Sequence, residues 1–185
     1  MENLIRGNPW HHEEEPIDEF EFSKIKHGYH AWNIMSPELE FCVLAGATVA
    51  ELGDEAIIVE TGVGQGYVTR RILDNLHENQ LFYAYESDPD WLAAIKPHFD
   101  SIRPGSPGIN VIAEADFLVF DSNSTSRLQE MKDWAEFGLI GSLCLIHDTF
   151  HHSQPHGDIL RRINSWKFDG EFIPIPRGAW LGVHP

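Results

Sequence analysis

The residues best suited to chemistry lie in the segment 57–73, IIVETGVGQGYVTRRIL. An apolar run ends in Glu60, and three glycines follow at alternating positions, Gly62, Gly64 and Gly66. Glycine lets the backbone turn tightly and lets a ligand approach main-chain N–H groups. A helical pattern begins directly after the turn. Strand, glycine turn and helix are typical of the first crossover in nucleotide-binding sheets.

A second carboxylate stands at the distance that such a site requires. The apolar run LFYAYE ends in Glu86, about 20 residues beyond Gly66. A carboxylate at this position can accept hydrogen bonds from both ribose hydroxyls of an adenosine. The two segments therefore predict a binding site for an adenosine-containing cofactor.

Alternating strand and helix patterns predict the sheet that would hold these residues. We expect strands at 56–60, 81–86, 109–114, 117–121 and 142–148, and two further strands within 172–183 joined at 176–178. Helices are expected at 36–52, after 66, from 88 to Pro97, from a capping box of Ser126 with Gln129, and around 159–166. This order predicts an α/β fold: a single-domain, doubly wound, mostly parallel sheet with an antiparallel C-terminal strand.

The third and fourth expected strands, 109–114 and 117–121, follow each other with almost no linker. A parallel crossover normally takes a dozen residues or more. Either the usual helix between them is missing, or one of the two segments is not a full strand. The sequence leaves both alternatives open.

Size and charge narrow the function classes. The chain has 185 residues and a net charge of −16, which fits one domain and disfavours nucleic acid and anionic membranes as partners. Two cysteines in apolar runs and the absence of a long apolar span favour a reduced protein in the cytoplasm. Residues 1–35, acidic and interleaved with aromatics, are interpreted as an arm on the domain or as a lid over the site, and 36–185 as the cofactor-binding domain.

The spacing of the glycines, G-x-G-x-G after an acid, differs from the dinucleotide fingerprint G-x-G-x-x-G. The motif ETGVGQG resembles the first motif of class I S-adenosylmethionine (SAM)-dependent methyltransferases. The resemblance extends over roughly residues 37–184 and includes Glu86, FLVFDS, GLIGSLCLIHDT and PRGAWLGV. The last two segments look most like the group that shares a family with proteins named cephalosporin hydroxylases and with small-molecule O-methyltransferases.

The resemblance implies roles for individual residues. The turn would cradle the methionine part of the cofactor, with Glu60 facing its ammonium group, and Glu86 would bind the ribose. The residue after the third strand, Glu114 or Asp116, would contact the adenine amino group. The cofactor carries a sulfonium, an ammonium and no phosphate, so a turn edged by carboxylates suits it. The predicted cofactor-binding residues are Glu60, Thr61, Gly62, Gly64, Gly66, Glu86, Ser87 and Asp116.

Further polar residues end the fourth and fifth strands. Asp121 follows one, and His147 and Asp148 follow the other, just before a histidine-rich run. A hydroxyl acceptor must lose its proton, and a histidine titrating near neutrality suits that role. We expect His147 or His151 as the base, oriented by Asp148 or Asp121.

A divalent metal is the alternative at the same place. Some relatives bind one through carboxylates at the ends of strands four and five, which lowers the pKa of a catechol-type hydroxyl. Asp121 and Asp148, with His151 or His152, could form such a site here.

The leading hypothesis is methyl transfer from SAM to an oxygen or nitrogen nucleophile of a small molecule. A dinucleotide-dependent oxidoreductase is a second hypothesis, which the glycine spacing disfavours. The third is a non-catalytic family member that holds SAM without turning it over. Neither nucleic acid nor membrane is expected as a partner, and a homodimer is left open.

Overall fold

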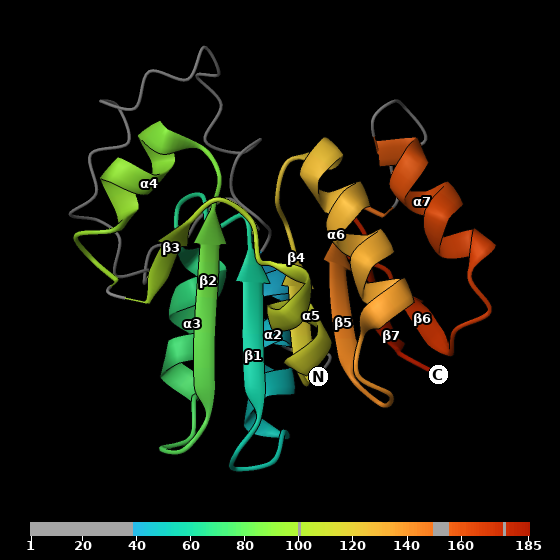
Figure 1. Cartoon of the computed structure of the whole chain (residues 1–185), viewed down its shortest axis with the longest axis horizontal. Helices are drawn as coiled ribbons and strands as arrows, with labels where there is room; N and C mark the ends of the chain where they lie inside the picture. Colours follow the sequence, from blue (N-terminus) through green and yellow to red (C-terminus); the bar gives the residue numbers. More distant parts are fainter. Residues whose placement is uncertain (1–38, 100, 150–155, 176) are drawn as a thin grey trace.

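The computed structural model describes residues 39–99, 101–149, 156–175 and 177–185. Its centre is a seven-stranded sheet in the order β3-β2-β1-β4-β5-β7-β6. The strands from β1 to β5 run parallel, and β7 pairs antiparallel with both β5 and β6. The predicted α/β sheet with an antiparallel C-terminal end is therefore confirmed (Figure 1).

The elements have the following bounds. The strands are β1 Ile57–Thr61, β2 Leu81–Glu86, β3 Ile102–Pro104, β4 Phe117–Phe120, β5 Leu143–His147, β6 Gly170–Ile173 and β7 Ala179–Val183. The helices are α2 Leu39–Ala50, α3 Tyr67–Asn75, α4 Pro89–Ile95, α5 Ile109–Glu114, α6 Ser124–Phe137 and α7 His156–Ser165.

Helices cover both faces of the sheet. Helices α5, α6 and α7 lie on the face turned to the viewer in Figure 1, and α2 and α3 lie behind it. Neighbouring residues of a strand serve the two layers alternately: Ile58 packs in the core with α2 and α3, and Val59 packs in the core with α5 and α6. Because both faces are buried, the strands read as continuous apolar runs.

The segment 109–114, expected as the third strand, is instead helix α5. Ile112 is fully buried, whereas Ile109 and Asn110 are exposed, so this segment packs one side only, as a helix does. The third strand is the three-residue β3, which pairs with β2 and ends at Pro104. The crossover between β3 and β4 is thus complete, and the alternative of a missing helix is wrong.

Local capping explains where two helices begin. Helix α4 starts at Pro89 as predicted, because the Asp88 carboxylate accepts hydrogen bonds from the N–H groups of Asp90 and Trp91 at 2.9 and 3.1 Å. Helix α6 begins earlier than the predicted cap at Ser126. Asn123 caps it, and its side-chain oxygen accepts from the N–H of Ser126 at 3.1 Å.

Several predictions fall on residues that the structure does not describe. The arm or lid at 1–35, the helix start at 36–38, and His151 and His152 all lie outside the described ranges. Across those ranges, every helix is too short or too polar to cross a bilayer.

Candidate functional site

All three glycines of the predicted turn adopt left-handed backbone angles, with φ of 79° at Gly62, 51° at Gly64 and 79° at Gly66. Packing also requires glycine at two of them. A Cβ at Gly62 would lie 2.4 Å from the Cα of Ser122, and one at Gly66 would lie 2.8 Å from the Cδ1 of Ile95. The turn is therefore wedged between the end of β4 and helix α4.

Glu86, the last residue of β2, holds the turn in place. Its Oε2 accepts from the N–H of Gly64 at 2.8 Å, and its Oε1 accepts from the N–H of Asp88 at 2.8 Å. Burial raises the pKa of Glu86, and these two N–H groups act in the lowering direction. A carboxylate oxygen has two lone pairs, so Glu86 can hold the turn and still accept a ligand hydroxyl.

Glu60 is a wholly buried carboxylate near the end of β1. Its Oε2 accepts from the hydroxyl of Thr69 at 2.7 Å, whereas its Oε1 has no hydrogen-bond partner among the described residues. Burial raises the pKa of Glu60 from 4.5 to about 8, and the Thr69 hydroxyl opposes this shift. The negative charges of Asp121 and Glu86 also act in the raising direction. Buried oxygens without a hydrogen-bond partner are rare, so we expect a ligand to donate a hydrogen bond to the Oε1 of Glu60.

The predicted catalytic residues of strands four and five do meet. Asp121, His147 and Asp148 each offer a ligand atom within 4.8 Å of the others. The Nδ1 of His147 lies 2.8 Å from the Oδ1 of Asp121, and its ring packs 4.3 Å from the ring of Phe41 on α2. His147 is fully buried, but 13% of the Asp121 side chain is exposed. Asp121 is thus the more accessible member of the pair.

Arg127, on α6, was not predicted as a site residue, yet it joins the two strand ends. Its NH1 donates to the carbonyl of His147 at 2.9 Å and to the Oδ2 of Asp148 at 3.1 Å. Its NH2 donates to the Oδ1 of Asp121 at 3.2 Å. Both its Nε and its NH2 donate to the carbonyl of Ser122. The guanidinium is 4% exposed and links the ends of β4 and β5.

A signal for Arg127 was present in the sequence. It shares the buried face of α6 with Glu130, Met131 and Trp134. A charge on the apolar stripe of a helix needs a buried partner, so its position indicates a polar contact beneath the helix.

Two more contacts anchor this region. The NH2 of Arg177, in the loop between β6 and β7, lies 2.6 Å from the Oδ1 of Asp148. The buried Glu130 accepts from the hydroxyls of Thr61 and Ser122 at 2.8 and 2.6 Å. The side chain of Thr61, predicted to bind the cofactor, is therefore used to attach α6 to β1.

The expectation that Asp116 contacts adenine is wrong. Asp116 precedes β4, and its Oδ2 accepts from the N–H of Ile57 at 2.8 Å, at the N-terminal ends of β1 and β4. Glu60 and Asp121 lie at the opposite edge. The third strand is β3, so the residue that follows it is Gly105, whose N–H donates to the Glu86 carbonyl at 2.8 Å. Misplacing that strand caused the error.

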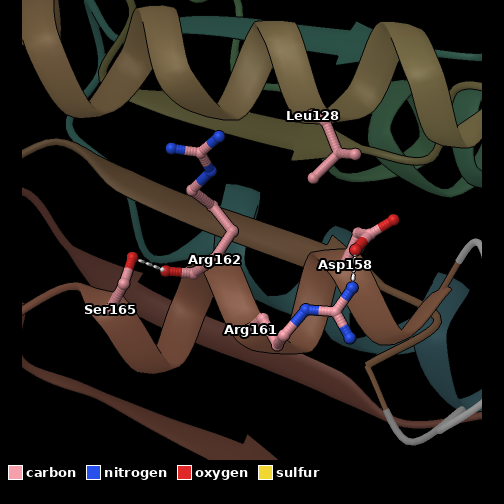
Figure 2. Close-up of a pocket in the computed structure, with 5 residues that line it drawn as sticks. All are labelled: Leu128, Asp158, Arg161, Arg162 and Ser165. Atoms are coloured by element: carbon pink, nitrogen blue, oxygen red, sulfur yellow. Dashed lines mark hydrogen bonds and ion pairs between the residues drawn. The ribbon is translucent and has the colours of Figure 1, made fainter.

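A hollow of about 300 Å³ lies elsewhere, between α6 and α7. Figure 2 shows its lining residues, Leu128 from α6 and four polar residues from α7, Asp158, Arg161, Arg162 and Ser165. Arg161 is paired with Asp158 there. None of the predicted site residues lines this hollow, and we do not assign the cofactor to it.

Comparison with known proteins defines the fold. No protein-family model matches the sequence, and no curated protein matches it. Among solved structures, an O-methyltransferase from Bacillus cereus in complex with S-adenosylhomocysteine (SAH) matches with a TM-score of 0.67. The identity is 12% over 82% of this chain and 83% of that one. The O-methyltransferase TomG from Streptomyces achromogenes in complex with SAM matches with a TM-score of 0.62 and 11% identity over 81% and 82%.

A third match broadens the range of chemistry. An rRNA methylase from Streptococcus thermophilus has a TM-score of 0.58 and 14% identity over 76% of this chain and 94% of that one. At such identities the likeness concerns the fold. The chain has the Rossmann-like fold of SAM-dependent methyltransferases, as its first motif predicted.

Proposed function

We propose that this chain is a SAM-dependent methyltransferase that acts on an oxygen or nitrogen nucleophile of a small molecule. Glu60 is the single observation that supports this most directly. It is a buried carboxylate beside the glycine turn, and within the part of the chain that the structure describes its Oε1 has no hydrogen-bond partner. Glu86 and Asp121 are near enough to influence its pKa. Glu60 and Glu86 have no arginine or lysine partner among the described residues, and two such carboxylates at one turn suit a cation.

The same charges disfavour a dinucleotide. A pyrophosphate would approach the carboxylates of Glu60 and Glu86 with like charge. It would also find the N–H of Gly64 already donated to Glu86, although phosphates at such turns are held by free N–H groups. SAM supplies a methyl group activated by a sulfonium and carries an ammonium. In this proposal Glu60 accepts from that ammonium, and Glu86 accepts from the ribose hydroxyls.

In this proposal Asp121 receives the proton of the acceptor. Its Oδ1 is occupied by His147 and Arg127, whereas its Oδ2 makes no hydrogen bond within the described part of the chain. We assign the base to Asp121 and the supporting role to His147, which reverses the order expected from sequence. The protein mainly aligns nucleophile and methyl, and such alignment can contribute several kcal/mol. A role for His151 stays a prediction.

Charge also favours a small acceptor. The fold itself leaves the acceptor open, since a structure of this fold is an rRNA methylase. The net charge of −16 would repel a phosphate backbone. We therefore propose a small-molecule acceptor and no divalent metal, because Arg127 and Arg177 already pair with Asp121 and Asp148. The presence of α5 removes the missing helix as an argument for a non-catalytic protein.

Calorimetric titration of the full chain with SAM, SAH and NAD⁺ tests the cofactor. SAM and SAH should bind, and NAD⁺ should not. Binding of NAD⁺ without SAM would overturn the proposal in favour of an oxidoreductase.

Turnover is tested separately, by measuring SAH formation with a panel of phenols, alcohols and amines. Formation of SAH with one acceptor supports an enzyme. Tight SAM binding with no SAH formed across the panel would favour the non-catalytic alternative.

The Asp121 assignment has its own test. Asp121→Asn should lower kcat strongly while the Kd for SAM changes little, because the amide cannot take up a proton. His147→Asn should lower kcat less, because it removes only a supporting contact. A larger loss for His147→Asn than for Asp121→Asn would restore histidine as the base.

A further inference from the structure

The carboxyl ends of β4 and β5 carry a set of donors that a metal ion could use. Oxygen atoms of Asp121 and Asp148 and a ring nitrogen of His147 all lie within 4.8 Å of one another. Donor type and spacing alone would therefore indicate a divalent cation. What surrounds these donors decides whether the cation is a metal.

A positive group already lies between the two carboxylates. Arg127 reaches Asp148 Oδ2 with NH1 at 3.1 Å and Asp121 Oδ1 with NH2 at 3.2 Å. A guanidinium is planar, always charged, and presents its donors as a rigid fork suited to carboxylates. Further bonds to the carbonyls of Ser122 and His147 fix its position. Arg127 is thus anchored as a resident ion would be.

A second arginine also balances the negative charge of Asp148. The NH2 of Arg177 lies 2.6 Å from Asp148 Oδ1, so Arg127 and Arg177 contribute two positive charges against the two negative charges of Asp121 and Asp148. Hard divalent ions such as Mg²⁺ and Ca²⁺ take six or more ligands, mostly oxygen atoms, and carboxylates supply the negative charge. At this place it would meet two guanidinium groups and a neutralised pair of acids.

We propose that Arg127 acts as a built-in cation that replaces a divalent metal between Asp121 and Asp148. Its task is positioning: it holds Asp121 Oδ1 so that Oδ2 stays available, and together with Arg177 it excludes metal ions. This inference concerns cation binding at the strand ends, and it stands whether or not the proposed methyl transfer is correct. It also predicts that removing the guanidinium turns the cluster into a metal site.

The test is Mn²⁺ binding to the full chain, monitored as the loss of the free-ion signal in electron paramagnetic resonance. Wild type should bind Mn²⁺ only as weakly as exposed surface carboxylates do. Arg127→Met should bind it about tenfold or more tightly, because one like charge is removed at contact distance. The melting temperature of this variant should then rise with Mn²⁺, while that of wild type does not.

Two controls make the result specific. Arg161→Met removes a helical arginine whose side chain is 65% exposed on α7 (Figure 2), and it should leave Mn²⁺ binding unchanged. Adding Asp121→Asn to Arg127→Met should abolish the gained binding. Tight Mn²⁺ binding by wild type that disappears in Asp121→Asn would overturn the proposal.

Should Arg127→Met fail to fold, Arg177→Met provides the decision. It removes the second guanidinium from a loop position whose side chain is 18% exposed and should likewise increase Mn²⁺ affinity. If the folded variants bind Mn²⁺ no better than wild type, the guanidinium groups do not exclude a metal and the inference is wrong. SAM titrations run on the same samples report on the proposed function independently.

Discussion

The carboxyl edge of the sheet carries two groups of acids, one around the glycine turn (the first half) and one at the ends of β4 and β5 (the second half). The two groups differ in their counter-charges. Around the glycine turn, Glu60 and Glu86 are buried, their hydrogen bonds from the described residues come from neutral groups, and the pKa of each is raised. At the ends of β4 and β5, Asp121 and Asp148 are paired with arginines.

This difference separates two tasks on one edge. Carboxylates left without a counter-charge are energetically costly until a cation arrives, which suits a site that takes up a positively charged methyl donor. Carboxylates that are already neutralised have fixed geometry before any ligand binds, which suits the alignment of an acceptor. The following changes would remove or sharpen this contrast, beginning with the largest expected effect.

Removing the positive charge of Arg127 from the ends of β4 and β5 should cause the largest loss of stability. Arg127→Met leaves Asp121 and Asp148 buried with less positive charge, and breaking a buried pair in this way costs about 3–5 kcal/mol of unfolding free energy. Chemical denaturation with wild type and Arg161→Met in parallel measures the loss. A loss no larger than that of Arg161→Met would mean that the second half does not depend on its guanidinium.

Gly64→Val should strongly weaken cofactor binding at the glycine turn. Gly64 has φ of 51°, a conformation that a β-branched residue adopts only with strain, and its N–H is bonded to Glu86. We expect SAM affinity to fall by about 100-fold or more, equivalent to about 2.7 kcal/mol. Calorimetry is the measurement, with Gly53→Ala as control, because a Cβ at Gly53 meets nothing within 4 Å. Wild-type affinity in the valine variant would show that SAM binds elsewhere.

Glu86→Gln should have an intermediate effect. It exchanges an acceptor of charged hydrogen bonds for a neutral amide, which should weaken SAM binding by about 1–3 kcal/mol. Glu78→Gln, an exposed change in the turn before β2, serves as the control in the same titration. Equal affinities for the two variants would remove Glu86 from the ribose site.

A change of one pH unit should have the smallest effect on SAM affinity. The pKa of Glu60 is about 8 in the free protein, so below that pH the carboxyl is mostly protonated and must release its proton to receive a cation. Affinity should therefore rise with pH by up to about tenfold per unit below 8 and level off above it. Titrations between pH 6 and 9 measure the slope. Glu60→Gln should flatten it, and an unchanged slope in that variant would assign the proton to another group.

Much of the fold followed from local signals. The glycine turn, the acid at Glu86, and the cap at Asp88 are set by neighbours in sequence, and each was correctly placed. The error at 109–114 arose because a six-residue apolar stretch is compatible with either a short helix or a strand. The residue expected at the adenine, Asp116, was displaced with it.

The candidate site at the ends of β4 and β5 could be predicted only in part from the sequence. Asp121, His147 and Asp148 could be paired because parallel strands end at the same edge. The contact of Arg127 with both strand ends depends on how α6 rotates against the sheet, and that of Arg177 depends on a loop that returns from β6. Neither can be read from spacing along the chain, so the compensated half of the site came from the structure.

Because Gly62 has no side chain, the glycine turn packs directly against the end of β4. Its backbone touches the main chain at Asp121 and Ser122 so closely that a single methyl group would overlap with them. The glycine turn and Asp121 are therefore packed in direct contact, and we expect a displacement of the turn to shift Asp121 as well. A larger residue at position 62 should disturb both the turn and the end of β4.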